Sequence, residues 1–210
     1  MSAATTLPLV MRCTSHSSSL AQLAEAAACV RAGGLVAFPT ETVYGIAAHA
    51  WDRAAVARLQ QVKGRPSDKP FTFHLWDARQ AAALARAVPA PAQRLMDALW
   101  PGPLTIILPG RDTPTVGLRL PDHPVARAFL QLCQVPVIAP SANRSGRPEA
   151  LDAAQVLATI GAELDMVIDS GPTTCRQSST VVDATSSPVR VLRDGAISRA
   201  ALRAAGVDLQ

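Results

Sequence analysis

Aromatic residues are scarce in this sequence, which holds one Tyr, four Phe and three Trp among 210 residues. Surfaces that bind nucleic acids by stacking bases need exposed aromatic side chains between their cations, and this composition argues against such a surface. Hydrophobic residues nevertheless make up 49% of the chain, so Ala, Val and Leu must fill most of a sizeable core.

Cysteine is also rare, with Cys13, Cys29, Cys133 and Cys175 spread along the chain. No two of them form a CxxC pair, and no histidine stands at the spacing of a zinc finger, which excludes the common structural zinc sites. We therefore expect four reduced thiols, mostly buried, no protein-bound metal site, and a cytoplasmic location.

Long hydrophobic runs are missing. No apolar run approaches the roughly 20 residues of a membrane helix, and the N-terminal stretch MSAATTLPLVMRC lacks the apolar core of a signal peptide. We expect no membrane partner. The formal net charge of +4 suits an anionic small molecule as well as a nucleic acid and decides between neither.

The common nucleotide motifs are absent too. The sequence contains neither a Walker A loop nor a GxGxxG fingerprint, and the spacing of its residues does not support a Ser-His-Asp triad. Any use of ATP would therefore require a different kind of nucleotide site.

Helices and strands are predicted from the spacing of apolar residues. The predicted helices are Leu20–Arg31, Asp52–Val62 with Asp52 as N-cap, Asp77–Ala87, Pro91–Leu99, His123–Cys133 with Pro124 in its first turn, Asp152–Ile160 and Ser198–Ala205. The predicted strands are Leu35–Phe38, Phe71–Trp76, Leu104–Leu108, Val116–Leu120, Val135–Ala139, Met166–Ile168, Ser179–Asp183 and Val189–Arg193.

These elements mix without strict alternation, which favours an α/β domain with a mixed sheet over a doubly wound parallel one. We find no internal repeat and no linker rich enough to divide the chain. The prediction is a loose N-terminal lead-in over residues 1–19 and one domain over residues 20–205.

Polar residues gather in the connections between these elements, where binding residues are common. Segment 63–69 carries Lys63, Arg65 and Lys69, and its Gly and Pro keep these cations out of a helix. A polyphosphate clamp and a solvated basic loop remain equally good interpretations. Segment 141–147 offers hydroxyl and amide groups with two more cations, which fits a phosphate cradle or an ordinary turn.

Arg119 and His74 lie inside predicted strands and each has a structural and a functional interpretation. Arg119 stands between Leu118 and Leu120, so the alternation of a strand directs it to the opposite face. A buried cation needs a partner, and a substrate carboxylate or a structural salt bridge would serve. His74 is either a satisfied core histidine or a functional group.

Several motifs occur together in one order. They are Pro39-Thr-Glu-Thr-Val-Tyr-Gly45, Lys63-Gly-Arg-Pro-Ser-Asp-Lys-Pro70, Trp100-Pro-Gly-Pro-Leu-Thr105, Arg119-Leu-Pro121, Ala139-Pro-Ser-Ala-Asn143 with Ser145-Gly-Arg-Pro148, Ser179-Thr-Val-Val-Asp183 and Leu192-Arg193. From about Leu20 to about Ala200 the chain resembles the YrdC-like family, and within it the short bacterial threonylcarbamoyl-AMP synthases. The turn at Trp100–Pro103 is most simply structural.

The resemblance implies a single YrdC-like domain, with a twisted mixed parallel and antiparallel sheet flanked by helices and a deep basic cavity on its concave face. It also implies a nucleotidyltransferase reaction. L-threonine and bicarbonate (or CO₂) form N-carboxy-threonine, which attacks the α-phosphorus of ATP to give threonylcarbamoyl-AMP and pyrophosphate. The implied partners include downstream proteins that transfer the threonylcarbamoyl group to tRNA.

The resemblance also assigns roles to residues of this chain. The positions that would hold L-threonine are Thr42, His74, Arg119, Ala139 through its backbone, and Ser179. The positions that would hold ATP are Arg65, Lys69, Thr115, Ser141, Glu149 and Arg193. Lys63 with Arg65, and Ser141 with Asn143, match the KxR and SxN signatures and are the predicted catalytic residues. Mg²⁺ is expected to arrive on the phosphates of ATP.

Some positions depart from the family pattern. Lys69 stands where many relatives carry Asn, and Cys175-Arg176-Gln177 fills a stretch that is often richer in Gly. Longer members carry a C-terminal domain whose linker covers the site, and we expect this cover to be missing here. We also expect Arg119→Met to leave the fold as stable as the wild type, on the premise that no protein group pairs with Arg119.

Two alternatives stay open. One is a non-catalytic protein that binds double-stranded RNA or tRNA in the same basic cavity. The other is a carbamoyl-transfer module of the type found in hydrogenase-maturation proteins, which belongs to much longer chains with acylphosphatase and zinc-finger segments.

Overall fold

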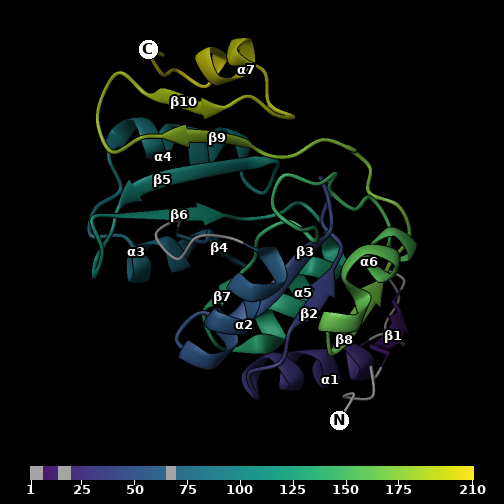
Figure 1. Cartoon of the computed structure of the whole chain (residues 1–210). Coiled ribbons are helices and arrows are strands. Elements are labelled where there is room, and N and C mark those ends of the chain that lie inside the picture. The colour runs from purple at the N-terminus through teal and green to yellow at the C-terminus, as the bar shows by residue number, and fades with distance from the viewer. Residues whose placement is uncertain (1–6, 14–19, 65–69) are drawn as a thin grey trace.

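The computed structural model describes residues 7–13, 20–64 and 70–210 (Figure 1). Its strands are β1 (Leu9–Arg12), β2 (Val36–Phe38), β3 (Gly45–His49), β4 (Phe73–His74), β5 (Leu104–Pro109), β6 (Thr115–Arg119), β7 (Val137–Ile138), β8 (Met166–Asp169), β9 (Thr180–Asp183) and β10 (Arg190–Arg193). Its α-helices are α1 (Leu20–Arg31), α2 (Arg53–Lys63), α3 (Ala81–Leu84), α4 (Ala90–Leu99), α5 (Pro124–Cys133), α6 (Ala153–Ile160) and α7 (Arg199–Ala204), with the 3-10 turns η2 (Ala78–Gln80) and η3 (Gly161–Glu163).

The strands form one sheet in the order β1-β8-β2-β3-β7-β4-β6-β5-β9-β10. Strand β8 pairs in parallel with β1 and β2, and the pairs β4–β6 and β5–β9 are also parallel. The remaining pairs, β2–β3, β3–β7, β4–β7, β5–β6 and β9–β10, are antiparallel. The predicted mixed α/β sheet is therefore confirmed.

Helices cover the half of the sheet around β2 on both faces (Figure 1). Val36 and Phe38 of β2 pack in one apolar cluster with residues of α1 and α5, whereas Leu35 and Ala37 pack in another with residues of α2 and α6. Adjacent residues of a strand point to opposite faces, so a strand buried on both sides reads as a continuous apolar run.

The half from β4 to β10 buries one face against α3, α4 and α7. On β5, Leu104, Ile106 and Leu108 enter that core, whereas Thr105 and Ile107 point to the opposite face and line a cavity. On β6, Leu118 likewise enters the core, whereas Arg119 points to the opposite face and lines the cavity. The predicted orientation of Arg119 toward the cavity is therefore confirmed. The one-sided covering of this half leaves room for the site described below.

Helices whose ends are marked by capping residues or by the spacing of apolar residues begin or end at the predicted positions. Helix α1 has the predicted bounds. Asp52 caps α2, with its side chain accepting hydrogen bonds from the backbone N–H groups of Ala54 and Ala55. His123 and Asp152 cap α5 and α6.

Elements whose partners lie far away in the sequence differ from the prediction. The predicted lead-in over residues 1–19 contains β1, where Met11 is buried and the strand pairs with β8. No strand was predicted over Gly45–His49, because Gly, Ala and His are weak strand formers, yet β3 pairs on both edges with β2 and β7. The helix predicted over Asp77–Ala87 stops at Leu84, because Ala85 forms a β-bridge with Gly110.

Within the described ranges, the structure contains no helix with the length and apolar character needed to cross a membrane.

Candidate active site

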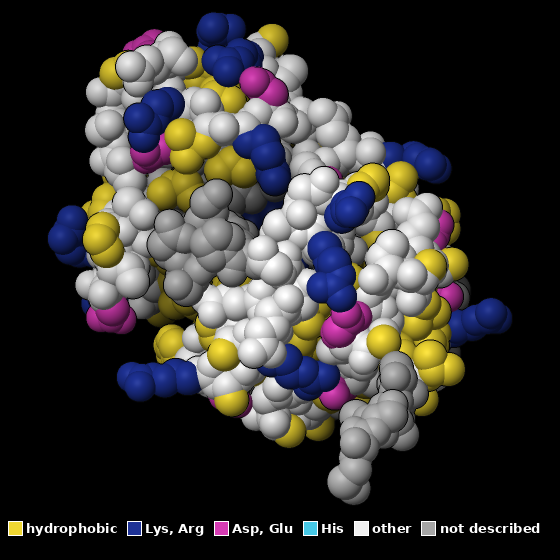
Figure 2. Space-filling model, viewed as in Figure 1, with side chains coloured by type: hydrophobic (Ala, Val, Ile, Leu, Met, Phe, Trp, Pro, Cys, Tyr) yellow, Lys and Arg dark blue, Asp and Glu magenta, His cyan; other side chains and the backbone are white. Residues whose placement is uncertain are grey.

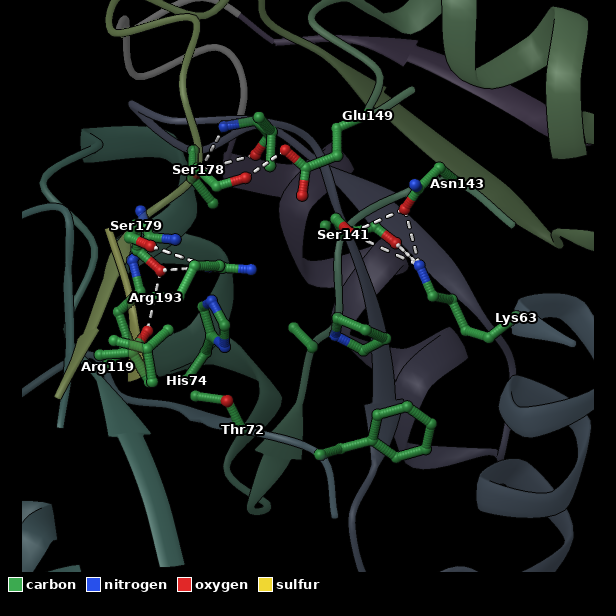
Figure 3. Close-up of a pocket in the computed structure, with 18 of the residues that line it drawn as sticks. Lys63, Thr72, His74, Arg119, Ser141, Asn143, Glu149, Ser178, Ser179 and Arg193 are labelled. Atoms are coloured by element: carbon green, nitrogen blue, oxygen red, sulfur yellow. Dashed lines mark hydrogen bonds between the residues drawn. The ribbon is translucent and has the colours of Figure 1, made fainter. Parts of the chain in front are cut away.

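A cavity of about 640 Å³ lies between the two halves of the sheet (Figure 3). Its lining includes nine of the residues predicted from the sequence, namely Lys63, His74, Arg119, Ala139, Ser141, Asn143, Glu149, Ser179 and Arg193. In Figure 3, Lys63, Ser141 and Asn143 lie on one side, and His74, Arg119, Ser179 and Arg193 lie on the other.

The other predicted residues have different positions. Thr42 lies directly behind the cavity, where its hydroxyl accepts a hydrogen bond of 2.7 Å from Arg119. Thr115 is an exposed residue at the start of β6 and does not belong to the lining. Arg65 and Lys69 fall outside the described residues.

Lys63 is the last residue of α2 and is only 4% exposed. Its ammonium group donates to the Ser141 carbonyl oxygen at 2.6 Å and to Asn143 Oδ1 at 2.7 Å. The Ser141 hydroxyl in turn lies 2.7 Å from Asn143 Oδ1. These acceptors are neutral oxygens, so the group presents a fixed cation and a hydroxyl at one wall of the cavity.

Arg119 forms a buried ion pair with Glu41, which was not among the predicted site residues. Its Nη2 donates to Glu41 Oε1 at 2.8 Å, and the two side chains are 6% and 7% exposed. The premise that no protein group pairs with Arg119 is therefore wrong. Glu41 belongs to the Pro39–Gly45 motif; the requirement that a buried arginine have a partner predicts that a partner exists but does not identify Glu41 as that partner.

Three polar atoms in this region are buried without a hydrogen-bond partner in the described structure: Arg119 Nε, Glu41 Oε2 and His74 Nδ1. Burying such an atom unpaired costs about 1–3 kcal/mol, so each one calls for an explanation. Arg119 and His74 also line the cavity. A ligand there that offers hydrogen-bond acceptors and a donor would therefore satisfy Arg119 Nε and His74 Nδ1.

His74 is held in its neutral form. Burial lowers the pKa of its imidazole to about 3, and the positive charge of Arg119 acts in the same direction. The His74 and Phe38 rings also form a perpendicular, T-shaped pair with their centroids 6.0 Å apart. At neutral pH His74 can therefore donate and accept hydrogen bonds without adding charge.

Arg193 and Ser179 form a second cluster beside Arg119. Arg193 Nη2 donates to the Ser179 carbonyl oxygen at 2.9 Å and to its hydroxyl at 3.1 Å. Burial lowers the pKa of Arg193, the carboxylate of Glu149 opposes this shift, and the charge of Arg119 adds to it. Glu149 itself accepts a hydrogen bond from Ser178.

The described lining carries an excess of positive charge. Lys63, Arg119, Arg147 and Arg193 contribute cations, and Glu149 is the acidic residue among them. Figure 2 shows Lys and Arg side chains on both sides of the hollow on this face. Such a cavity suits a ligand with carboxylate or phosphate groups. Nowhere in the described ranges do three or more His, Cys, Asp or Glu side chains gather to hold a metal ion.

Fold and site together define an α/β protein with a cavity, lined by several cations, between the halves of one mixed sheet. The chain belongs to the Sua5/YciO/YrdC family, whose model, described as "Telomere recombination", matches residues 28–195.

Two curated relatives are named threonylcarbamoyl-AMP synthase. The Pyrococcus abyssi protein is 40% identical over 181 residues, which cover 82% of this chain and 53% of the relative. The Bacillus subtilis protein is 39% identical over 193 residues, which cover 87% of this chain and 56% of the relative. The chain thus spans about half the length of these two relatives.

A solved structure of P. abyssi Sua5 complexed with L-threonine has the same fold. It matches with a TM-score of 0.89 and 35% sequence identity, and the match covers 98% of this chain and 63% of that protein.

The buried ion pair predicts a stability effect opposite to the one expected from the sequence. Arg119→Met should lower the free energy of unfolding by about 3–5 kcal/mol, because it leaves the charge of Glu41 buried without its partner. The double variant Glu41→Gln/Arg119→Met should recover most of this loss in urea denaturation.

Arg190→Met is the matched control, because Arg190 pairs with Asp183 at a side-chain exposure of 59%. Its loss should stay below about 1 kcal/mol. If Arg119→Met unfolded at the same urea concentration as the wild type, the pair would not contribute to the fold.

The lowered pKa of His74 predicts a pH dependence of stability. Between its ordinary pKa of 6.5 and its folded value of about 3, the unfolded chain binds a proton that the folded protein does not. Stability should therefore fall as the pH falls through this window, by about 1.4 kcal/mol per pH unit from this one group.

His74→Gln should remove this contribution. Between pH 5.5 and pH 4.5 the wild type should lose about 1.4 kcal/mol more unfolding free energy than the variant, measured by urea denaturation. Equal losses would mean that the pKa of His74 in the folded protein is close to its ordinary value.

Proposed function

We propose that the chain is a threonylcarbamoyl-AMP synthase that uses L-threonine, bicarbonate and ATP and releases pyrophosphate. The observation that carries this proposal is that two sets of residues suited to bind a ligand face each other across one cavity. Arg119 and His74, each with an unpartnered buried atom, lie opposite the buried Lys63–Ser141–Asn143 group. An amino acid and a nucleotide would meet between them.

The end of the cavity at Arg119 suits L-threonine. Nη2 of Arg119 is engaged by Glu41 and Thr42, which leaves Nε to donate to a substrate carboxylate. Neutral His74 would add a hydrogen bond without a charge, and the Ser179 hydroxyl and the Ala139 backbone would complete the site. The P. abyssi relative complexed with L-threonine supports this assignment.

The opposite end suits the phosphates of ATP. Lys63 would contribute a fixed positive charge and Ser141 a hydroxyl group. Arg193, which lies beside Ser179 on the other side of the cavity, and Glu149 also belong to the lining and would contact the nucleotide. Arg65 and Lys69 keep their predicted roles as ATP ligands. Thr115 lies outside the lining, so a contact with it would require part of the nucleotide to extend beyond the cavity.

The reaction needs little covalent help from the protein. The carboxylate of N-carboxy-threonine attacks the α-phosphorus, a bond from that carboxylate oxygen to phosphorus forms, and the bond to pyrophosphate breaks. Positioning and cancellation of phosphate charge then lower the barrier. Mg²⁺ would arrive on the triphosphate and bind mainly through phosphate oxygens and water, which agrees with a described lining whose one carboxylate is Glu149.

RNA binding alone is the weaker candidate. Stacking of bases needs exposed aromatic side chains, and among the described residues Trp51 is the one large aromatic side chain that is exposed. The buried, partly unpaired groups at Arg119 favour a small ligand instead. We place the reaction in the cytoplasm, with the product passed to proteins that modify tRNA.

The proposal predicts strict substrate dependence. Pyrophosphate release from ATP should require both L-threonine and bicarbonate, because the attacking carboxylate is made from the two. Labelled bicarbonate should appear in threonylcarbamoyl-AMP, as detected by chromatography of the reaction mixture. Pyrophosphate release at an equal rate without L-threonine would contradict the proposal, and RNA binding without any turnover would favour the alternative.

A further inference from the structure

Thr105 is the last residue of the Trp100–Thr105 motif, and it follows the turn at Trp100–Pro103. The residue is 4% exposed and points from β5 into the cavity, whereas its neighbours Leu104 and Ile106 are buried in the core beneath. A buried hydroxyl at this position must be hydrogen-bonded, and its partner shows what it does.

The partner is Ser179, whose hydroxyl oxygen lies 2.9 Å from Thr105 Oγ1. The same Ser179 oxygen accepts a hydrogen bond of 3.1 Å from Arg193 Nη2. A guanidinium group can only donate, so one lone pair of Ser179 is committed to Arg193. Either hydroxyl can donate in the bond between Thr105 and Ser179.

The direction of that bond sets which hydroxyl proton is left for a ligand. The described residues offer the Thr105 hydroxyl no hydrogen-bond partner other than Ser179. If Ser179 donated to Thr105, the Thr105 proton would have no acceptor among the described residues, and Ser179 would have no proton left for a ligand. If Thr105 donates, both lone pairs of Ser179 are used and the Ser179 proton is left to point into the cavity.

We infer that Thr105 is a positioning residue, which aims the Ser179 proton at an acceptor oxygen of the amino-acid substrate. This inference rests on the proposed function and extends it to a residue that does not itself hold the substrate. The acceptor would be a carboxylate or hydroxyl oxygen, because Ser179 lies beside Arg119 on the same side of the cavity (Figure 3).

Two substitutions separate the proton from the shape of the side chain. Thr105→Val keeps the shape and removes the donor, and it should raise the KM for L-threonine about tenfold with kcat and the KM for ATP nearly unchanged. Thr105→Ser keeps the donor and should stay within about threefold of the wild-type KM. In a Ser179→Ala background, Thr105→Val should have little further effect.

Thr180→Val is the matched control, because Thr180 is equally buried on the opposite face of β9 and bonds the backbone of Ile197. It should leave the KM for L-threonine unchanged, and thermal melts should show that each variant is folded. An unchanged KM in Thr105→Val, or equal effects of Thr105→Val and Thr105→Ser, would overturn the inference alone. A wild-type protein that neither binds L-threonine in calorimetry nor uses it would overturn the proposed function together with the inference.

Discussion

The ion pair between Glu41 and Arg119 is the interaction on which the site depends. It joins the segment after β2 to the end of β6, two parts of the chain that are 78 residues apart. The backbone oxygen of Glu41 also accepts a hydrogen bond from Cys175 N–H at 2.7 Å, which attaches the segment before β9. On β4, His74 is the register partner of Arg119, and the charge of Arg119 contributes to its low pKa. A pair that costs desolvation energy thus organises several walls of the cavity.

The sheet supplies the space for this arrangement. Its half around β2 is covered by helices on both faces, whereas the half from β4 to β10 packs α3, α4 and α7 on one face. The uncovered face presents Thr105, Arg119 and other polar side chains that alternate with core residues along the same strands. The loops after β2 and β7 and the end of α2 contribute further polar groups to the same cavity. Strands therefore fix His74 and Arg119, which we propose to hold L-threonine, whereas the end of α2 and the loop after β7 contribute Lys63 and Ser141, which we propose for ATP.

Features with local causes could be predicted from the sequence. Helix α1 has the predicted bounds and Asp52 caps α2, because apolar spacing and capping residues act over a few positions. The strand alternation also placed Arg119 on the cavity face. Nine of the predicted site residues line the cavity. They could be predicted because the family resemblance indicates which residues, far apart in the sequence, share one site, whereas local patterns do not. Partners that are distant in the sequence could not be predicted, as with β1 and β8, Glu41 and Arg119, and Thr105 and Ser179, since no local signal specifies them.

The central claim is that Arg119 receives an amino-acid carboxylate at Nε while its Nη2 stays paired with Glu41. A crystal structure of this chain with L-threonine tests the claim most directly. We expect a carboxylate oxygen at about 3 Å from Arg119 Nε, with the bond between Arg119 Nη2 and Glu41 intact. L-threonine bound at Lys63 with no contact to Arg119, or a ligand that displaces Glu41 from Arg119, would contradict it.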